Sequence, residues 1–165
     1  MDDSELKIHF EDFLKRFKSL CISSINIDGW PMISYAPFVV DENRIYHVFL
    51  SDLSKQTHCL RESRKASIML IEDEESSSQI FARNRVIFEC DVRELEDGVE
   101  ATERILDKMQ KEFGELLSTL RSLKDFHLFQ LKPRVGSFVM GFGKAYDVYG
   151  DKMDLLEPVR IKKRG

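Results

Sequence analysis

The sequence has few cysteines and no long apolar run. Its three cysteines, Cys21, Cys59 and Cys90, are widely spaced and none forms a C-x-x-C pair, which excludes the zinc and redox sites that need such a pair. We expect reduced and mostly buried thiols. No stretch approaches the ~18 consecutive apolar residues of a membrane-spanning helix, and residues 1–10 lack the apolar run of a signal peptide. The sequence therefore predicts a cytoplasmic protein with no membrane partner.

The chain also lacks an excess of basic charge. Its 25 Lys and Arg residues are outnumbered by 29 Asp and Glu residues, and the formal net charge is −4. Nucleic-acid-binding proteins usually carry a basic face, so no nucleic-acid partner is expected. Basic residues cluster only in 151–165, which we expect to be a mobile, solvated tail or, alternatively, to fold over an anionic cofactor. The clustered cations are Arg160, Lys162, Lys163 and Arg164.

Motifs of several common enzyme classes are missing as well. There is no H-E-x-x-H, no G-x-S-x-G elbow, no P-loop and no G-x-G-x-x-G after a strand. The four histidines, His9, His47, His58 and His127, are far apart in the sequence. Hydrolase and NTPase functions are therefore disfavoured.

What is present is the composition of a folded soluble protein, with 42% hydrophobic and 33% charged residues. A length of 165 residues fits a single domain, 1–165. Apolar residues at helical spacing predict an amphipathic helix over 3–17 and a longer helical stripe over 98–121, which Gly114 is expected to divide.

Alternating and β-branched segments predict a mainly β core between these helices. Asp28-Gly29 is a turn signal, a short helix is expected over 51–63, and residues 72–78 form an acidic loop. Tight turns between the first strands favour antiparallel pairing, so we predict an α+β, mainly β fold: an antiparallel β-barrel with peripheral helices. The predicted strands are 21–27, 31–40, 44–50, 66–71, 83–95, 126–131 continuing past Pro133 into 136–140, and 144–148.

Two clusters on the first strands are candidates for ligand binding. Tyr35 lies among small residues in the segment 34–38, where a flat ligand can approach the backbone; ordinary barrel packing, with Pro37 marking an edge, explains the same residues. Ser51 and Lys55 lie where a strand leads into the short helix, and free N–H groups there can bind an anion. Helix capping by Ser51 or Ser54 is the alternative.

Two further clusters carry charge. Arg83 and Arg85 share a face if both lie on a strand, and they can hold the carboxylates of an anionic cofactor or pair with the acidic loop instead. Asp125 and His127 likewise share a strand face. Such an aspartate can orient a metal-ligating histidine, whereas the alternative is a solvent-facing pair.

Taken in order, six segments resemble the bacterial haem-utilisation proteins of the HutZ/HugZ type. The resemblance implies a split β-barrel related to pyridoxamine-phosphate oxidases, and a homodimer that holds haem at its interface. Apolar residues such as Phe38 and Phe142 would then be buried between protomers. The six segments are 34–39 (SYAPFV), 67–74 (SIMLIEDE), 81–85 (FARNR), 113–115 (FGE), 123–126 (LKDF) and 138–146 (FVMGFGKAY).

The resemblance also implies roles for individual residues. Some family members degrade haem oxidatively and release iron. Arg85 matches an arginine near the haem, and Asp125 matches an aspartate that hydrogen-bonds an axial histidine supplied by the C-terminal tail across the interface. Residues 151–165 contain no histidine here, so His127 is the nearest substitute ligand and His58 a weaker rival.

FMN is the alternative cofactor, because proteins of the wider superfamily bind it. They hold the FMN phosphate with basic residues. The corresponding positions hold Met32, Ile33, Gln56 and Thr57, and only Ser51 and Lys55 remain as phosphate contacts. Three functions stay open: a haem-binding protein that degrades haem, an FMN-dependent oxidoreductase, and a haem carrier without catalysis.

Overall fold

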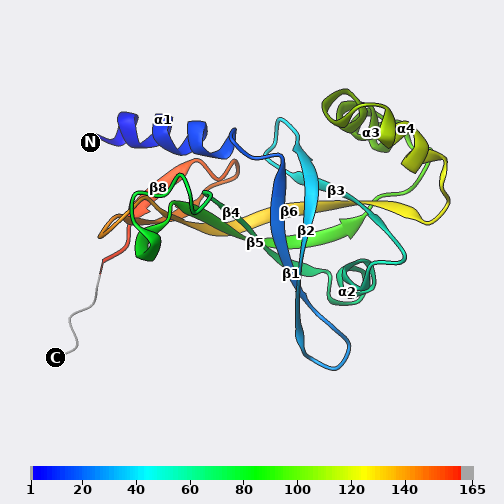
Figure 1. The fold of residues 1–165 in the computed structure, drawn as a ribbon, viewed down its shortest axis with the longest axis horizontal. Coiled ribbons are helices and arrows are strands. Elements are labelled where there is room, and N and C mark those ends of the chain that lie inside the picture. Colours follow the sequence, from blue (N-terminus) through cyan, green and yellow to red (C-terminus); the bar gives the residue numbers. More distant parts are fainter. Residues whose placement is uncertain (1, 161–165) are drawn as a thin grey trace.

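Within residues 2–160, eight strands pair in one antiparallel sheet, in the order β3-β2-β1-β4-β5-β6-β7-β8, and β3 also pairs with β6. This extra pairing closes β1 to β6 into a six-stranded barrel and leaves β7 and β8 as an extension (Figure 1). The computed structural model describes residues 2–160. The elements are α1 Asp3–Leu14, β1 Ser19–Ile25, β2 Pro31–Val40, β3 Tyr46–Ser51, α2 Lys55–Ser63, β4 Lys65–Ile71, a 3₁₀ turn Ile80–Ala82, β5 Arg85–Glu94, α3 Glu100–Phe113, α4 Glu115–Ser122, β6 Phe126–Val139, β7 Ala145–Tyr149 and β8 Leu155–Pro158.

The long strand β6 joins the barrel to its extension. Along one edge it pairs with β5; along the other it pairs first with β3, through Phe126–Leu131, and then with β7, through Gly136–Val139. The register with β5 shifts between Glu89 and Cys90, opposite Pro133. Proline has no N–H to donate to a ladder, which explains why the irregularity falls where β6 changes partner.

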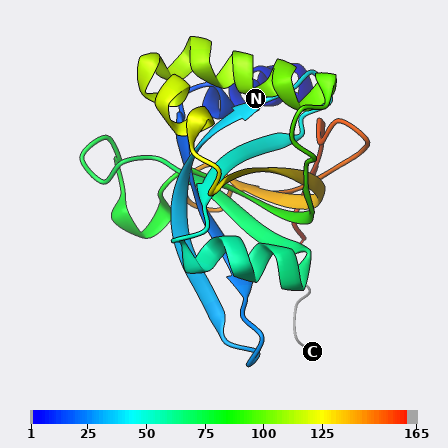
Figure 2. The ribbon, with the colours of Figure 1, turned by 90° about the vertical axis from the view of Figure 1, so that its right-hand side faces the viewer.

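Helices cover the barrel on several sides. α1 begins with a capping box between Asp2 and Glu5, and its fully buried Phe10 and Phe13 pack on Phe138 of β6 with ring centroids 5.2 and 5.6 Å apart. α3 and α4 form a second apolar cluster with β2 and β6, and Figure 2 shows α2 on the opposite side of the barrel.

The predicted split antiparallel barrel with peripheral helices is confirmed, and so is the break at Gly114, whose φ of +79° ends α3. The short helix begins at Lys55 rather than at residue 51, because Ser51 still belongs to β3. Among residues 2–160, no helix is long and apolar enough to cross a membrane.

The prediction of a loose tail from residue 151 is wrong for its first part. Leu155–Pro158 pairs with β7 as β8, and Met153 just before it is 5% exposed. Four residues are too few to show alternation, so the sequence carried little signal for this strand. Lys162, Lys163 and Arg164 lie outside the described residues.

Phe38, expected between protomers, is instead a core residue. It is 6% exposed and packs on Tyr46 inside the barrel, with ring centroids 5.3 Å apart. Phe142 is 70% exposed in the turn after β6, so it remains available to a partner.

Candidate functional site

The predicted site residues fall into two groups at opposite ends of β6. Asp125 immediately precedes the strand and His127 is its second residue, whereas Arg85 pairs with Val139 at the other end. At about 3.3 Å per residue, these ends are roughly 40 Å apart along the strand. A single small ligand therefore cannot contact both groups of one chain.

The first group lies where β3 leads into α2. The Ser51 hydroxyl donates to Asp125 Oδ2 over 2.8 Å and accepts from the Leu53 N–H over 3.0 Å. The Asp52 N–H donates to the Asp125 carbonyl over 2.7 Å, and the Thr57 hydroxyl donates to the Ser51 carbonyl over 2.6 Å. These bonds fix Ser51 and the Asp125 backbone, while Asp125 Oδ1 has no hydrogen-bond partner among the described residues.

His127 lies in a closed network of charges that also includes Asp52, Arg61 and Glu94. Its Nε2 is 2.8 Å from Asp52 Oδ2, and its Nδ1 is 3.0 Å from Glu94 Oε1. Arg61 bridges the same carboxylates, at 2.7 Å from Asp52 and 2.6 Å from Glu94. Hydrogen bonds from His127 and then Arg61 hold the pKa of Asp52 below its usual value, and Arg61 does the same for Glu94. We call Ser51, Asp52, Arg61, Glu94, Asp125 and His127 the α2 cluster.

This geometry does not offer His127 to a metal. Both ring nitrogens lie against carboxylate oxygens of Asp52 and Glu94, so an iron ion could reach either nitrogen only if the ring left these contacts. No group of three or more His, Cys, Asp or Glu side chains among the described residues could hold a metal ion. Asp125 is not the partner of His127, because it lies in the turn before the strand.

The start of α2 also does not fit the phosphate of FMN. The Ser51 hydroxyl is engaged by Asp125, and the carboxylates of Asp52 and Asp125 lie beside it. Lys55 is exposed, and Arg61, the other cation beside Asp52, is already paired with Asp52 and Glu94. A dianionic phosphate would meet like charges there, so the residues present do not fit the group.

In the second group, the two arginines have different environments. Arg83 precedes β5 instead of lying on it, because the turn Ile80–Ala82 delays the strand until Arg85. Its Nε donates to the Glu72 carbonyl over 3.0 Å, and its Nη1 is 3.2 Å from Glu74 Oε1. The prediction that Arg83 and Arg85 share a strand face is therefore wrong. Arg83 instead pairs with the acidic loop, which was the alternative prediction.

Arg85 is half-buried and makes no ion pair with a described residue; its Nη1 donates to the Arg83 carbonyl over 3.0 Å. It points outward from the barrel beside an apolar surface. In register across β2, β1, β4 and β5 lie Tyr35, Cys21, Met69 and Ile87, all with side chains outside the barrel. The next row begins with Ile33 on β2 and ends with Val135 on β6, with Ser23, Ser67 and Glu89 between them. We call the first row, with Ile33 and Val135, the outer face.

The outer face is unusually exposed for apolar residues. Ile33 and Tyr35 are each 72% exposed and Val135 is 46% exposed. The structure thus brings Tyr35 and Arg85 to one face, three strands apart, and separates both from Ser51, Asp125 and His127. The sequence analysis did not identify Asp52, Arg61 and Glu94 as site residues, because in the sequence they cannot be distinguished from ordinary charged surface residues.

Comparisons with known proteins agree with this architecture. The model of the pyridoxamine 5'-phosphate oxidase family matches residues 6–140. A curated protein of Vibrio cholerae, named haem oxygenase HutZ, is 36% identical over 158 residues, which cover 96% of this chain and 88% of that protein.

Solved structures show the same relationship. The crystal structure of HutZ, described as the haem storage protein from Vibrio cholerae, has a TM-score of 0.74 at 33% identity and covers 77% of this chain and 89% of its own. ChuZ of Campylobacter jejuni has a TM-score of 0.85 at 28% identity; the match covers 96% of this chain but only 64% of ChuZ.

Proposed function

Because the chain belongs to the pyridoxamine 5'-phosphate oxidase family, in the branch that contains HutZ, we propose that it is a haem-binding protein of haem utilisation. HutZ is described as a haem oxygenase and, in its crystal structure, as a haem storage protein. Binding is common to both descriptions. The three free thiols suit a reducing compartment, and we place the protein in the cytoplasm.

The observation that carries this proposal is the unpaired charge of Arg85 beside the outer face. Haem is a flat apolar macrocycle with two propionates, so it needs apolar walls and at least one cation. Arg85 is half-buried without a carboxylate partner among the described residues, and Ile87 and Met69 provide apolar surface nearby. A guanidinium in such a place is well suited to bind a carboxylate.

We also propose that the protein is a homodimer formed through the outer face. Exposed apolar surface of this kind usually marks an interaction site. Because Arg85 and Asp125 lie at opposite ends of β6, they can reach the same ligand only from different protomers. Asp125 Oδ1 is then a free acceptor for a group at the haem, while Tyr35 supplies an aromatic wall.

Haem binding is supported more strongly than haem degradation. When bound, haem would supply an iron centre for oxygen chemistry. His127 is held by two carboxylates, so we propose that it positions the α2 cluster and does not ligate the iron. Among the described residues, Arg85 and the outer face are what would hold the group.

Titration with haemin, followed by the Soret absorption, tests the proposal. Arg85→Ala should weaken binding about tenfold, which corresponds to ~1.4 kcal/mol for a lost charge-assisted hydrogen bond. Arg93→Ala is the matched control, since Arg93 is exposed at the far end of the same strand. Equal affinities of Arg85→Ala and the wild type, or a wild type without a Soret band, would refute the proposed site.

Sedimentation velocity tests the dimer. The wild type should sediment as a dimer at micromolar concentration, and Ile33→Glu should dissociate it and weaken haem binding together. A monomeric wild type, or a monomeric Ile33→Glu that binds haem with unchanged affinity, contradicts a site shared by two protomers.

A further inference from the structure

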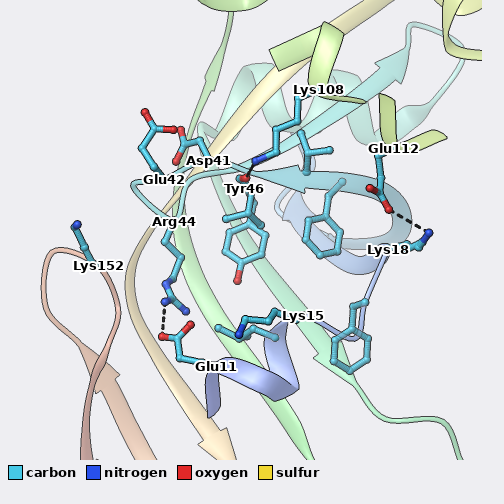
Figure 3. Close-up of a pocket in the computed structure, with 15 residues that line it drawn as sticks. Glu11, Lys15, Lys18, Asp41, Glu42, Arg44, Tyr46, Lys108, Glu112 and Lys152 are labelled. Atoms are coloured by element: carbon cyan, nitrogen blue, oxygen red, sulfur yellow. Dashed lines mark hydrogen bonds and ion pairs between the residues drawn. The ribbon is translucent and has the colours of Figure 1, made fainter. Parts of the chain in front are cut away.

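A separate pocket opens where α1, the β2–β3 turn, α3 and the loop before β8 meet (Figure 3). Its volume is about 330 Å³, which lies within the range of small-molecule sites. None of its lining residues belongs to the α2 cluster or to the outer face. A ligand there would therefore be distinct from the proposed haem.

The floor of the pocket is aromatic and presents one hydroxyl that has no protein partner among the described residues. Tyr46 is 1% exposed, and its ring is fixed between Phe38 and Phe88, with centroids 5.3 and 5.7 Å away. Its hydroxyl makes no hydrogen bond with any described residue, and Figure 3 shows it directed toward the side of the pocket that holds Arg44 and Lys15. A buried phenol usually finds a partner, because leaving its O–H unpaired is unfavourable.

Burial also sets the protonation state of this hydroxyl. Desolvation raises the pKa of Tyr46 far above its usual value, which the nearby charge of Arg44 offsets only in part. The phenol therefore stays protonated throughout the neutral range and presents a hydrogen-bond donor to the pocket. Phe17 and Leu14 add apolar surface to the same floor.

The cations around the pocket differ in their partners. Arg44 is paired with Glu11 at 2.5 Å, and Lys18 with Glu112 at 3.1 Å. Lys108 donates to the Val40 carbonyl and makes no ion pair with a described residue. In Figure 3 its ammonium lies at the backbone end of Tyr46, away from the hydroxyl, and the carboxylate of Glu42 points away. A ligand beside the hydroxyl therefore meets the charge of Arg44 and not that of Lys108.

We propose that this pocket binds a small aromatic carboxylate. The flat body of the ligand packs on Phe17, Phe38 and Leu14, and its carboxylate accepts from the Tyr46 hydroxyl on the side of the pocket that holds Arg44. Aromatic rings on the floor favour a flat aromatic body over a flexible aliphatic chain. A hydroxyl donor beside the Arg44 guanidinium favours an anion over a neutral group.

The probe for this site is 2-naphthoate, compared with the neutral 2-naphthamide, and binding is followed by chemical-shift mapping and calorimetry. 2-Naphthoate should shift amide resonances of Phe17, Val40 and Arg44, and should bind more tightly than 2-naphthamide. Tyr46→Phe should weaken 2-naphthoate about tenfold, because it removes a hydrogen bond to a charged acceptor.

Tyr46→Phe keeps the ring and both of its stacking contacts, so the variant should fold. Its melting temperature without ligand should equal or exceed that of the wild type, since the hydroxyl has no partner to lose. Tyr35→Phe is the matched control: it deletes an equivalent hydroxyl on the outer face and should leave 2-naphthoate binding unchanged.

Several results would overturn this assignment: no shift of the pocket resonances at millimolar 2-naphthoate, equal affinity for 2-naphthamide, unchanged affinity in Tyr46→Phe, or an equal loss in Tyr35→Phe. Haemin titration of Tyr46→Phe should match the wild type. The two proposals can therefore fail independently.

Discussion

Gly136 lies in β6 at the point where that strand begins to pair with β7, and we predict that Gly136→Ala destabilises the protein. A Cβ at this position would lie 2.4 Å from Phe88 Cδ1 and 2.8 Å from both Phe88 Cε1 and the Ile87 carbonyl oxygen. Phe88 is fully buried and packs on Tyr46, so its ring has no free space into which it can move. Either the ring or the β5–β6 pairing must shift.

The magnitude follows from two opposing effects. Overpacking a core of this kind costs about 1–3 kcal/mol. Replacing glycine by alanine within a strand raises the free energy of unfolding by about 0.5–1 kcal/mol, because it lowers the entropy of the unfolded chain. Because the closest approach is so short, we expect the free energy of unfolding to fall by about 2 kcal/mol.

Urea denaturation followed by far-UV circular dichroism measures this change. Phe88→Leu in the same background should relieve the clash, so the double variant should be more stable than the sum of the two single effects predicts. A Gly136→Ala protein within about 0.5 kcal/mol of the wild type would refute the close packing of β5 on β6.

Two further predictions concern histidines. His127→Ala should leave the position and affinity of the haem Soret band unchanged, as should the control His58→Ala; a shifted band in His127→Ala alone would identify His127 as the iron ligand. Burial lowers the pKa of His47, against the opposing effect of Asp41. The unfolded chain therefore gains a proton below pH ~6.5 that the folded protein resists, and stability falls with decreasing pH by up to ~1.4 kcal/mol per pH unit until the folded pKa is reached. Urea unfolding at pH 7.5 and 5.5 should show this loss in the wild type and a smaller loss in His47→Gln; equal losses would contradict it.

Local signals were sufficient to predict most of the fold. β2 was predicted over 31–40 and is Pro31–Val40, and Gly114 divides the long helical stripe as expected. Both signals are local: strand alternation between turn residues, and a glycine with positive φ. β8 is different, since its four residues are held by pairing with β7 rather than by any pattern of their own.

The candidate site was less predictable because its partners come from distant elements. Glu94 ends β5, Asp52 precedes α2 and Arg61 lies within that helix. Yet Asp52 and Glu94 both contact His127, and Arg61 bridges the two carboxylates. Only closure of the barrel between β3 and β6 brings them together. Alternation along a strand predicted that Asp125 and His127 lie on the same face. β6 begins at Phe126, however, so Asp125 lies in the preceding turn and accepts a hydrogen bond from Ser51.

The separation of Arg85 from Asp125 has a thermodynamic consequence for the proposed function. A ligand that contacts both groups must bind the dimer better than the monomer, because one protomer presents only half of the contacts. Any ligand with such a preference shifts the equilibrium toward the form it favours, by an amount set by its concentration and affinity. The linkage is reciprocal, so dimerisation must raise haem affinity by the same factor by which haem strengthens the dimer. In the proposed dimer, the exposed apolar residues of the outer face and the unpaired charge of Arg85 would thus belong to a single equilibrium, and a change at Ile33 would alter haem binding without a contact to the haem.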